Sequence, residues 1–442
     1  MTSTLRRAGG FAAVGTLSLA APELGQAAAA PFAVVAILAA FVVDEGPLFD
    51  LFARPQDRRD GRLNGLAGFS LAATGLALLA TVPRQAMPLS IYVATVFILS
   101  YGNLGARLVE ERSSDPFRSA AGFAGGAFLA ALGGQAAVVS MTEAAGLASV
   151  AAALPTLAFV ASSGALVAAL LRSMLYERDD PLVLLTTGLL LWLFVSLTDG
   201  VAAVEISIAL AVTALLGSLS YALGTASVPG MLTGVLLGLL TIVFGGFGWF
   251  AVLIAFFAIG GLSSKFRYEQ KRERGVAEDN EGARGSGNVL GNAAVALVAV
   301  VGYAAGSHLP VDPLLFRFAF TGSLAAAMSD TLSSEIGVLF DRPRLVTTFE
   351  RVAPGTDGGV TWQGYLAGVV GAVVVGVVAV SLFSFESPLL AAAAIVVGGV
   401  TGMTVDSVLG ATLEGGWVGN QAVNFAGTLA GALVSVVLAV VL

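Results

Sequence analysis

The chain has 442 residues, of which 57% are hydrophobic and only 12% are charged, and its mean hydropathy is +0.88. Soluble globular proteins carry about 25% charged residues, so this composition excludes an ordinary water-exposed surface, and it equally excludes a disordered chain. The chain has no Cys, which excludes disulfide bonds and a cysteine-bound metal centre. The net charge of −7 argues against the basic surface that nucleic acid requires, so we expect no nucleic-acid partner.

Apolar runs of about 20 residues recur along the whole chain, which predicts an all-α, polytopic bundle of transmembrane helices in the cell membrane. We expect about 14 or 15 spans by this criterion. The first ten are expected at 8–22, 27–43, 64–82, 88–106, 119–140, 146–171, 181–198, 203–222, 229–245 and 247–263. The remaining five are expected at 289–306, 312–328, 362–384, 388–402 and 421–441. The first run follows Arg6 and Arg7, and we interpret it as an uncleaved helix rather than a signal peptide.

The basic residues predict the orientation of these spans. If the N-terminus is cytoplasmic, every Lys and Arg except Arg84 and Arg317 falls in the N-terminus or in a loop on the cytoplasmic side. This is the distribution that the positive-inside rule describes, so we expect a cytoplasmic N-terminus.

The one extended hydrophilic stretch, 264–287, predicts the domain organisation. Its acidic and basic residues nearly balance, which is typical of a cytoplasmic linker or a short amphipathic helix. We therefore expect an N-terminal membrane domain of about ten helices at 1–263 and a C-terminal membrane domain of the catalytic type at 288–442. Two N-terminal stretches, 44–68 and 101–126, are compatible with a degenerate internal repeat, and the role of this domain is left open.

Four polar clusters lie near the predicted cytoplasmic ends of spans in the C-terminal domain. They are RGSGNVLGN at 284–292, SDTLSSEIG at 329–337, PGTDGGVT at 354–361, and DSVLGA at 406–411 followed by GNQAVN at 419–424. Carboxylates at membrane depth are costly and usually face a cavity, an ion or a partner. Converging acids repel each other unless a divalent cation lies between them, and Mg²⁺ is commonly held by one or two carboxylates and by substrate phosphates. We therefore expect Asp330, Glu335 and Asp406 to be the catalytic residues and to bind Mg²⁺.

Each cluster also has a purely structural interpretation. Asp330 or Ser329 can cap a short helix, and GTDGG is the composition of an ordinary turn. Asn420 and Asn424 share a helix face, and they can simply hydrogen-bond to a neighbouring helix. On a continuous helix Glu335 points about 140° away from Asp330, so both acids serve one site only if the helix breaks there.

The clusters, in this order, resemble the transmembrane protein 19 family (domain of unknown function 92), whose plant member acts as a phytyl-phosphate kinase. The similarity covers about residues 290–442 and is carried by RGSGNVLGN, SDTLSSEIG, APGTDGGVTWQG, VDSVLGATLEG and GNQAVNFAGTLAGAL. The chain departs from the family pattern at Asn288, Gly291, Ala293 and Glu414. These departures weaken any role for Asn288 or Glu414 and leave the assignments of Asp330, Glu335, Asp357 and Asp406 unaffected.

The resemblance implies a kinase that transfers the γ-phosphoryl group of CTP to an isoprenoid monophosphate, with Mg²⁺ as cofactor. The partner is then an isoprenoid phosphate lipid, and a second copy of the chain is a further candidate partner. A Gly-rich run before a helix can direct N–H groups at phosphate. The expected nucleotide-binding residues are Gly355, Thr356, Asp357, Gly358, Gly359 and Thr361. The expected residues for the substrate phosphate are Arg284, Asn292, Ser407, Asn420 and Asn424.

Two other functions are compatible with the same sequence. A cytidylyltransferase that joins CMP to a lipid phosphate needs the same metal and motifs, and it differs in the phosphorus that is attacked. A transporter or lipid flippase also fits many spans and a repeat. A transport path requires polar groups at several membrane depths, whereas the clusters here lie at one face.

Overall fold

A computed structural model describes residues 3–83, 86–176, 179–198, 201–224, 227–277, 285–414 and 418–441. Most of the described residues are helical. The fold class expected from the sequence, an all-α, polytopic membrane bundle, is therefore confirmed. Two compact units divide the chain, one at 1–210 and one at 211–442, and the boundary falls inside α11 (Ala203–Ala222).

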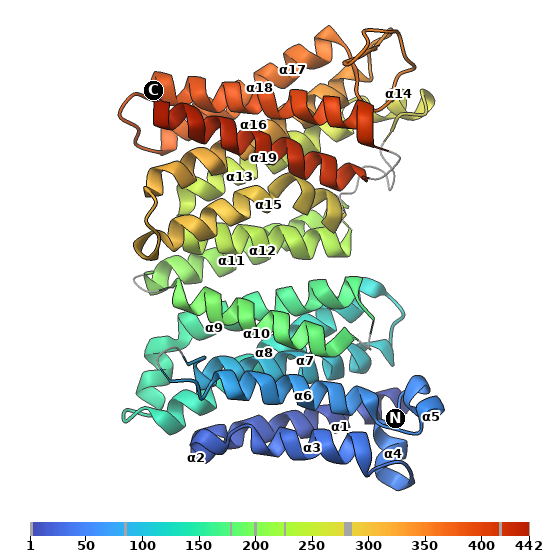
Figure 1. Cartoon of the computed structure of the whole chain (residues 1–442), viewed down its shortest axis with the longest axis vertical. Coiled ribbons are helices and arrows are strands. Elements are labelled where there is room, and N and C mark those ends of the chain that lie inside the picture. Colours follow the sequence, from blue (N-terminus) through green and yellow to red (C-terminus); the bar gives the residue numbers. More distant parts are fainter. Residues whose placement is uncertain are drawn as a thin grey trace. The chain divides into compact units, whose positions relative to one another are not determined.

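The first unit is an assembly of helices around the buried helix α7 (Figure 1). Its helices are α1 (Ser3–Gly15), α2 (Ala21–Leu24), α3 (Ala30–Phe41), α4 (Gly46–Phe52), α5 (Pro55–Asp60), α6 (Asn64–Leu79), α7 (Leu89–Glu110), α8 (Pro116–Thr142), α9 (Leu147–Met174) and α10 (Asp180–Ser196), with short 3-10 helices η1 (Thr16–Ala20) and η2 (Gly25–Ala27). Helix α7 packs against α1, α8, α9 and α10. An ideal Cβ on Gly105 of α7 would lie 2.3 Å from the carbonyl oxygen of Gly122 on α8, so the absence of side chains lets these two helices touch.

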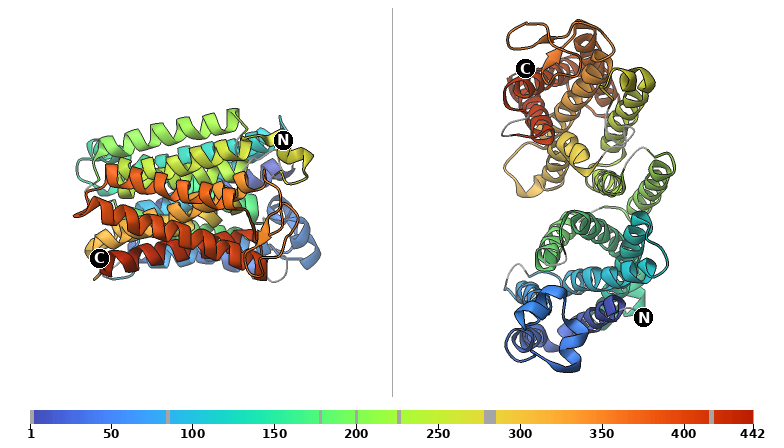
Figure 2. Two further views of the ribbon diagram at one scale, coloured as in Figure 1. Left: turned by 90° about the horizontal axis from the view of Figure 1, so that it is seen from above. Right: turned by 90° about the vertical axis from the view of Figure 1, so that its right-hand side faces the viewer.

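The second unit contains the rest of α11 and the remaining elements. These are α12 (Val228–Gly245), α13 (Phe247–Lys265), α14 (Tyr268–Glu273), α15 (Ser286–Ala304), η5 (Gly306–His308), α16 (Pro313–Gly337), β1 (Arg344–Leu345), β2 (Gly359–Val360), α17 (Trp362–Leu382), α18 (Pro388–Leu413) and α19 (Asn420–Val441). Helix α16 lies at the centre of this unit and packs against α13, α15, α17, α18 and α19. The helices appear nearly end-on in the right-hand view of Figure 2.

The division differs from the one that the polar stretch 264–287 suggested. Helices α12 and α13 precede that stretch, yet α12 packs against α15 and α13 packs against α16 and α17. The buried ring of Trp249 on α13 explains part of this packing, because its centroid lies 4.7 Å from that of Tyr303 on α15 and 4.6 Å from that of Phe320 on α16. Aromatic contacts of this kind favour burial together, so α13 is part of the second unit.

Within the described residues, ten helices are long and apolar enough to cross a membrane, or eleven if the segments 3–27 and 30–41, which meet at 112°, form one broken span. This is fewer than the 14 or 15 spans expected. Helices α6 and α10 are apolar but have only 16 and 17 residues. Helix α16 is long enough, but it carries Arg317, Asp330 and Glu335 and is not among the ten.

The connection between α16 and α17 contains the two strands. Strands β1 and β2 pair antiparallel, with Arg344 opposite Val360 and Leu345 opposite Gly359. This ribbon places the Gly-rich run 354–359 over the ends of α16 and α18, which is the part of the unit that holds the site.

Candidate functional site

A cavity of about 300 Å³ opens in the second unit, where the ends of α15, α16, α18 and α19 meet the α16–α17 connection. Its wall includes members of all four polar clusters, so the topology brings together segments that are far apart in the sequence. Asn288, Asn292, Asp330, Thr331, Ser333, Ser334, Glu335, Gly355, Thr356, Asp357, Gly358, Gly359, Asp406, Ser407, Gly410, Glu414, Asn420 and Asn424 line it, together with Val276 and several apolar or proline residues.

Two acids from different helices face each other in this cavity. Asp330 on α16 and Asp406 on α18 are close enough for their side chains to hydrogen-bond. Two ionised carboxylates repel at such a distance, so the pair needs a shared proton or a cation. Asn424 of α19, with its amide nitrogen turned toward the pair, donates to Asp406 Oδ2 at 3.2 Å and to Asn420 Oδ1 at 2.9 Å.

Glu335 has a different partner. Helix α16 is continuous to Gly337, so Glu335 lies on another face from Asp330, and its Oε2 accepts a hydrogen bond from Lys271 Nζ on α14. Both side chains are buried, and Lys271 also donates to the carbonyl oxygens of Ser263 at 2.9 Å and Ser264 at 3.3 Å. Within the described residues no three acids come together as a metal-binding group, so the expected set of three is a pair here.

The lining is strongly acidic. It holds the carboxyl groups of Asp330, Glu335, Asp357, Asp406 and Glu414, and none of the lining residues is Lys or Arg. Of these five, Glu335 is neutralised by Lys271. The remaining four acids make the cavity a place where a cation is favoured and an uncompensated anion is repelled.

The Gly-rich run takes a backbone conformation that glycine permits. Gly355 has φ +83° and Gly358 has φ +70°. An ideal Cβ on Gly358 would lie 2.4 Å from Ala411 Cβ and 2.6 Å from the carbonyl oxygen of Ser407, so this run packs directly on α18. Only glycine combines the left-handed φ with this close approach.

The N–H groups of this run fall into two sets. Those of Thr356 and Gly359 close turns by donating to the carbonyl oxygens of Ala353 at 3.2 Å and Thr356 at 2.9 Å. The N–H groups of Asp357 and Gly358 have no acceptor among the described residues. Successive free N–H groups in a glycine turn form the concave arrangement that binds anionic oxygen.

Thr361, expected to bind nucleotide, caps a helix instead. Its Oγ1 accepts a hydrogen bond from the N–H of Gly364 at 3.1 Å, at the start of α17, and it donates to the carbonyl oxygen of Gly337 at 3.4 Å. Thr361 is buried and is not one of the lining residues.

The residues expected to bind the substrate phosphate are mostly together. Asn292, Ser407, Asn420 and Asn424 all line the cavity, whereas Arg284 lies outside the described residues. Asn292 is buried, and its amide donates to the carbonyl oxygen of Asn288 at 2.9 Å and to Asn288 Oδ1 at 3.0 Å.

Sequence reasoning underrated Glu414 and missed Lys271. Glu414 follows Asp406 and Gly410 at steps of four residues, which is the spacing of one helix face and was the available signal. Partial burial raises the pKa of Glu414, and the neighbouring Asp357 carboxylate raises it further. The signal for Lys271 was its rarity, because the chain has only two lysines.

Comparison with known proteins identifies the second unit. The sequence profile of integral membrane protein DUF92 matches residues 211–432. The chain belongs to the DUF92 family. The resemblance expected from the four clusters is therefore confirmed, and the matched region begins well before them, in α11.

Relatives of the chain include two proteins named as membrane proteins. An uncharacterized membrane protein of Methanocaldococcus jannaschii is 35% identical, over 47% of this chain and 84% of its own length. The chloroplast protein VTE6 of Arabidopsis thaliana is 32% identical, over 48% of this chain and 65% of its own length. Protein PGR of the same plant is 31% identical, over 47% of this chain and 78% of its own length. No solved structure matches the chain.

Proposed function

We propose that this DUF92 protein is a membrane kinase that uses CTP to convert an isoprenoid monophosphate to the diphosphate at the cytoplasmic membrane face. The observation that carries the proposal is the cavity itself. A pair of acids, a set of side-chain amides and a glycine turn with free N–H groups meet at the ends of apolar helices. Membership of the family and the similarity to protein VTE6 support a kinase-like role.

The donor set of the cavity fits a magnesium ion. Asp330 and Asp406 supply hard carboxylate oxygens from two helices, and their mutual repulsion is relieved by a divalent cation. The lack of a three-acid group among the described residues also fits, since Mg²⁺ usually takes one or two carboxylates and completes its shell with phosphates and water. When bound, the ion would neutralise phosphate charge during transfer.

The glycine turn is the proposed site for the nucleotide phosphates. The N–H groups of Asp357 and Gly358 donate to phosphate oxygens, and the close packing of Gly358 on α18 holds this turn beside Asp406. Preorganised donors of this kind stabilise charge that develops in the transition state.

The acceptor phosphate is proposed to lie against the amides of Asn292, Asn420 and Asn424. Its prenyl tail would remain in the hydrocarbon beside the exposed apolar residues of α19, such as Phe425 and Leu429. An oxygen of the acceptor phosphate forms a bond to the γ-phosphorus of CTP, the bond from that phosphorus to the β–γ bridging oxygen breaks, and CDP leaves.

This reaction needs no strong general base in the protein. A phosphate monoester has a second pKa of about 6, so the acceptor is already ionised near neutral pH. The only His of the chain, His308, precedes α16, whereas Asp330 lies near the other end of that helix. Positioning and charge neutralisation then supply most of the catalysis.

The decisive assay uses the full chain in lipid nanodiscs with Mg²⁺, γ-labelled CTP and geranylgeranyl phosphate. We expect label on the lipid, and we expect Asp330→Asn to lower the rate by about a hundredfold or more, the scale of losing one charge-stabilising group. Asp312→Asn is the matched control, because it changes an exposed acid that caps the other end of α16 and leaves a residue that also caps.

Other results of the same assay would replace the proposal. Release of pyrophosphate with CMP attached to the lipid indicates a cytidylyltransferase. Absence of nucleotide turnover with any prenyl or lipid phosphate, in protein that is folded, overturns both enzyme functions. Movement of the lipid across vesicles would then favour a transporter or flippase.

A further inference from the structure

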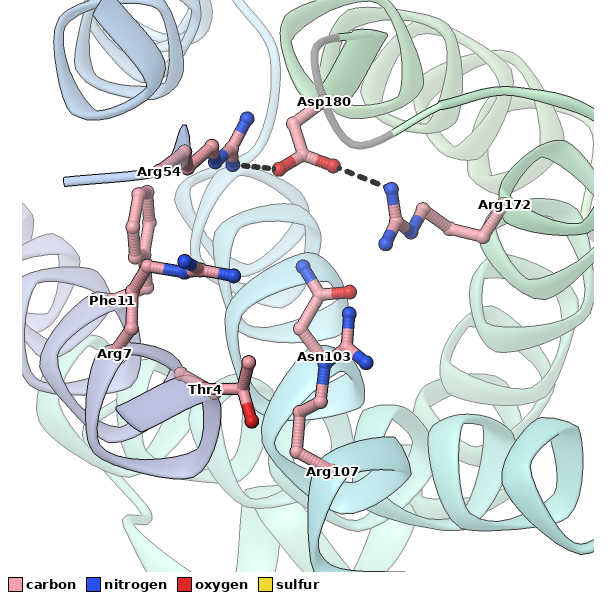
Figure 3. A pocket seen from close by; sticks show the side chains of 9 residues that line it. Thr4, Arg7, Phe11, Arg54, Asn103, Arg107, Arg172 and Asp180 are labelled. Carbon is pink, nitrogen blue, oxygen red and sulfur yellow. Dashed lines mark hydrogen bonds and ion pairs between the residues drawn. The ribbon is translucent and has the colours of Figure 1, made fainter. Parts of the chain in front are cut away.

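Four arginines of the first unit surround one small cavity (Figure 3). They are Arg7 of α1, Arg54 at the start of α5, Arg107 of α7 and Arg172 of α9, so the cluster is built from four separate elements. Thr4, Ala8, Phe11, Asn103 and Asp180 complete the lining. The lining thus holds four arginines and one acid, the reverse of the acidic lining in the second unit, and Arg107 also pairs with Glu110 outside the lining, Nη1 to Oε2 at 2.5 Å.

The cluster is held in place by packing as well as by charge. Arg54 Nη2 lies 2.5 Å from Asp180 Oδ2, and Arg172 Nη1 lies 3.0 Å from Asp180 Oδ1. The Asp180 side chain is only 3% exposed, and those of Arg54 and Arg172 are 12% and 16% exposed. The Arg54 guanidinium also stacks over Phe11, with its Cζ 5.4 Å from the ring centroid. These contacts hold the guanidinium groups of Arg54 and Arg172 in place before a ligand binds. Less side-chain entropy is then lost on binding.

The size of the cavity restricts what it can hold. Its volume is about 30 Å³. A cavity needs about 10–15 Å³ to hold one water molecule, so this space suits a group the size of about two or three waters. A phosphate group has this size, whereas a nucleotide or a sugar does not fit. Arginine matches the oxygen atoms of phosphate with paired N–H donors, and Thr4 and Asn103 add neutral hydrogen-bonding groups.

The position of the cavity points to a membrane boundary. Arg107 and Arg172 lie in the last turns of α7 and α9, which are both candidate spans, and Asp180 is the first residue of α10. Two of the four guanidinium groups therefore lie where apolar helices end, which is where lipid headgroups and dissolved anions are expected. We infer that the first unit contains a binding site for a phosphate group, presented either as free phosphate or as the headgroup of a phosphorylated lipid.

This inference goes beyond the proposed function, because it concerns a unit outside the region matched by the DUF92 profile. The competing interpretation is a network of ion pairs that only fastens helix ends together. The two differ in whether the unit has a saturable affinity for phosphate that depends on these arginines.

The test measures binding of inorganic phosphate to the full chain in uncharged detergent with EDTA. Without divalent cations the acidic cavity of the second unit repels anions, so binding there is suppressed. We expect phosphate to raise the thermal midpoint saturably, as a ligand of the native state does, while chloride at equal ionic strength does not. Equal effects of phosphate and chloride overturn the site.

Variants then locate the binding. We expect Arg107→Gln and Arg172→Gln each to weaken phosphate binding at least tenfold. The matched control is Arg118→Gln, which removes a guanidinium that is 68% exposed and paired with Asp115, and we expect it to leave the affinity unchanged. If Arg172→Gln fails to fold, Arg107→Lys is the deciding variant. It keeps the positive charge but lacks the paired N–H donors of arginine, so we expect the phosphate affinity to fall several-fold. Unchanged affinity in the Arg107 variants overturns the site.

Two further experiments identify the source of the bound phosphate group and the unit that binds it. Hexyl phosphate that binds at least tenfold more tightly than inorganic phosphate supports a lipid headgroup, and equal or weaker binding supports free phosphate. Gly358→Ala disturbs the glycine turn that is proposed to bind phosphate in the second unit, and it should leave the phosphate affinity intact. Loss of binding in that variant would place the phosphate in the second unit and overturn the inference, independently of whether the kinase assay succeeds.

Discussion

At the scale of single residues, Gly358 of the acidic cavity is constrained both by its backbone conformation and by its close neighbours. Its φ is +70°, and an ideal Cβ would lie 2.4 Å from Ala411 Cβ. Gly358→Ala is therefore expected to introduce both backbone strain and a steric clash. We expect this variant to displace the glycine turn and to lower phosphoryl transfer by at least tenfold, at a cost of about 1 kcal/mol or more in stability. The measurement is the labelled-CTP assay together with the thermal midpoint.

A matched glycine separates this effect from a general intolerance of alanine. Gly261 lies within α13, and an added Cβ would meet nothing within 4 Å. Gly261→Ala should keep full activity and equal or greater stability, since alanine favours a helix. Equal losses in both variants would contradict the role assigned to the turn.

Glu414 is expected to make the folding stability depend on pH, and the direction of this dependence follows from its pKa. Its pKa is raised in the folded protein, first by partial burial and then by Asp357, so the folded state holds this proton more tightly than the unfolded state does. Stability is therefore expected to fall as pH rises from the ordinary range of a glutamate through the raised pKa. Glu414→Gln removes this dependence. Thermal midpoints of the two proteins should converge at acidic pH and separate above it, with the variant more stable.

The opposite order of midpoints would contradict this assignment. Asp341→Asn serves as the control, because Asp341 is an exposed acid of the same unit that pairs with Arg274 outside the cavity lining. Its midpoint is expected to lack the rise of the Glu414 variant at neutral pH.

At the scale of elements, one buried ion pair fastens α14 to α16. Lys271→Met leaves the Glu335 carboxylate buried without its partner, so we expect a loss of about 3–5 kcal/mol in unfolding free energy. Val276 follows α14 and packs on Gly355, so the same variant should also loosen the glycine turn. Denaturant unfolding in detergent and the transfer assay measure the two effects.

The adjacent residue provides the control. Arg272 pairs with Glu269 on the same short helix, but both side chains are about two-thirds exposed, and Arg272→Met should cost less than about 1 kcal/mol. Replacing both buried partners, as Lys271→Met with Glu335→Leu, should recover most of the stability. If the single Lys271 variant is as stable as the control, the pair has no structural role.

Hydropathy predicted most elements well and their ends less well. Spans expected at 229–245 and 247–263 are found as α12 and α13, because Gly246 has φ +89° and separates two apolar runs. Spans expected at 312–328 and 388–402 continue to Gly337 and Leu413. In both, the helix goes on after the apolar run stops, because the polar residues of its last turns face the cavity rather than lipid.

Several residues that line the cavity were predictable as neighbours, but several of their partners were not. Asp330, Asp406, Asn420 and Asn424 do meet in one cavity. Local spacing does not reveal that Lys271 reaches Glu335, which is 64 residues away, or that Thr361 serves as a helix cap. Such pairings depend on tertiary packing, which a single sequence does not encode in any short pattern.

At the scale of the whole molecule, the predicted orientation, with a cytoplasmic N-terminus, can be tested directly. The chain has no Cys, so single cysteines can be introduced without any background. Thr356 and Ser307 are exposed and lie in the connections at the two ends of α16. We expect Thr356→Cys to react with a membrane-impermeant maleimide only after cells are opened, and Ser307→Cys to react in intact cells. The reverse pattern would place the N-terminus and the acidic cavity outside.

The glycine contact between α18 and α19 has a consequence for how the membrane acts on the site. An ideal Cβ on Gly427 would lie 3.0 Å from Asp406 Cβ and 3.1 Å from the carbonyl oxygen of Gly402, so the two backbones touch one helical turn from the acid pair. Backbone atoms in contact leave no layer of side chains to compress or to rearrange. Lateral pressure and acyl-chain length should therefore change the tilt of these helices together, while the separation of the acids from the amides of α19 stays constant.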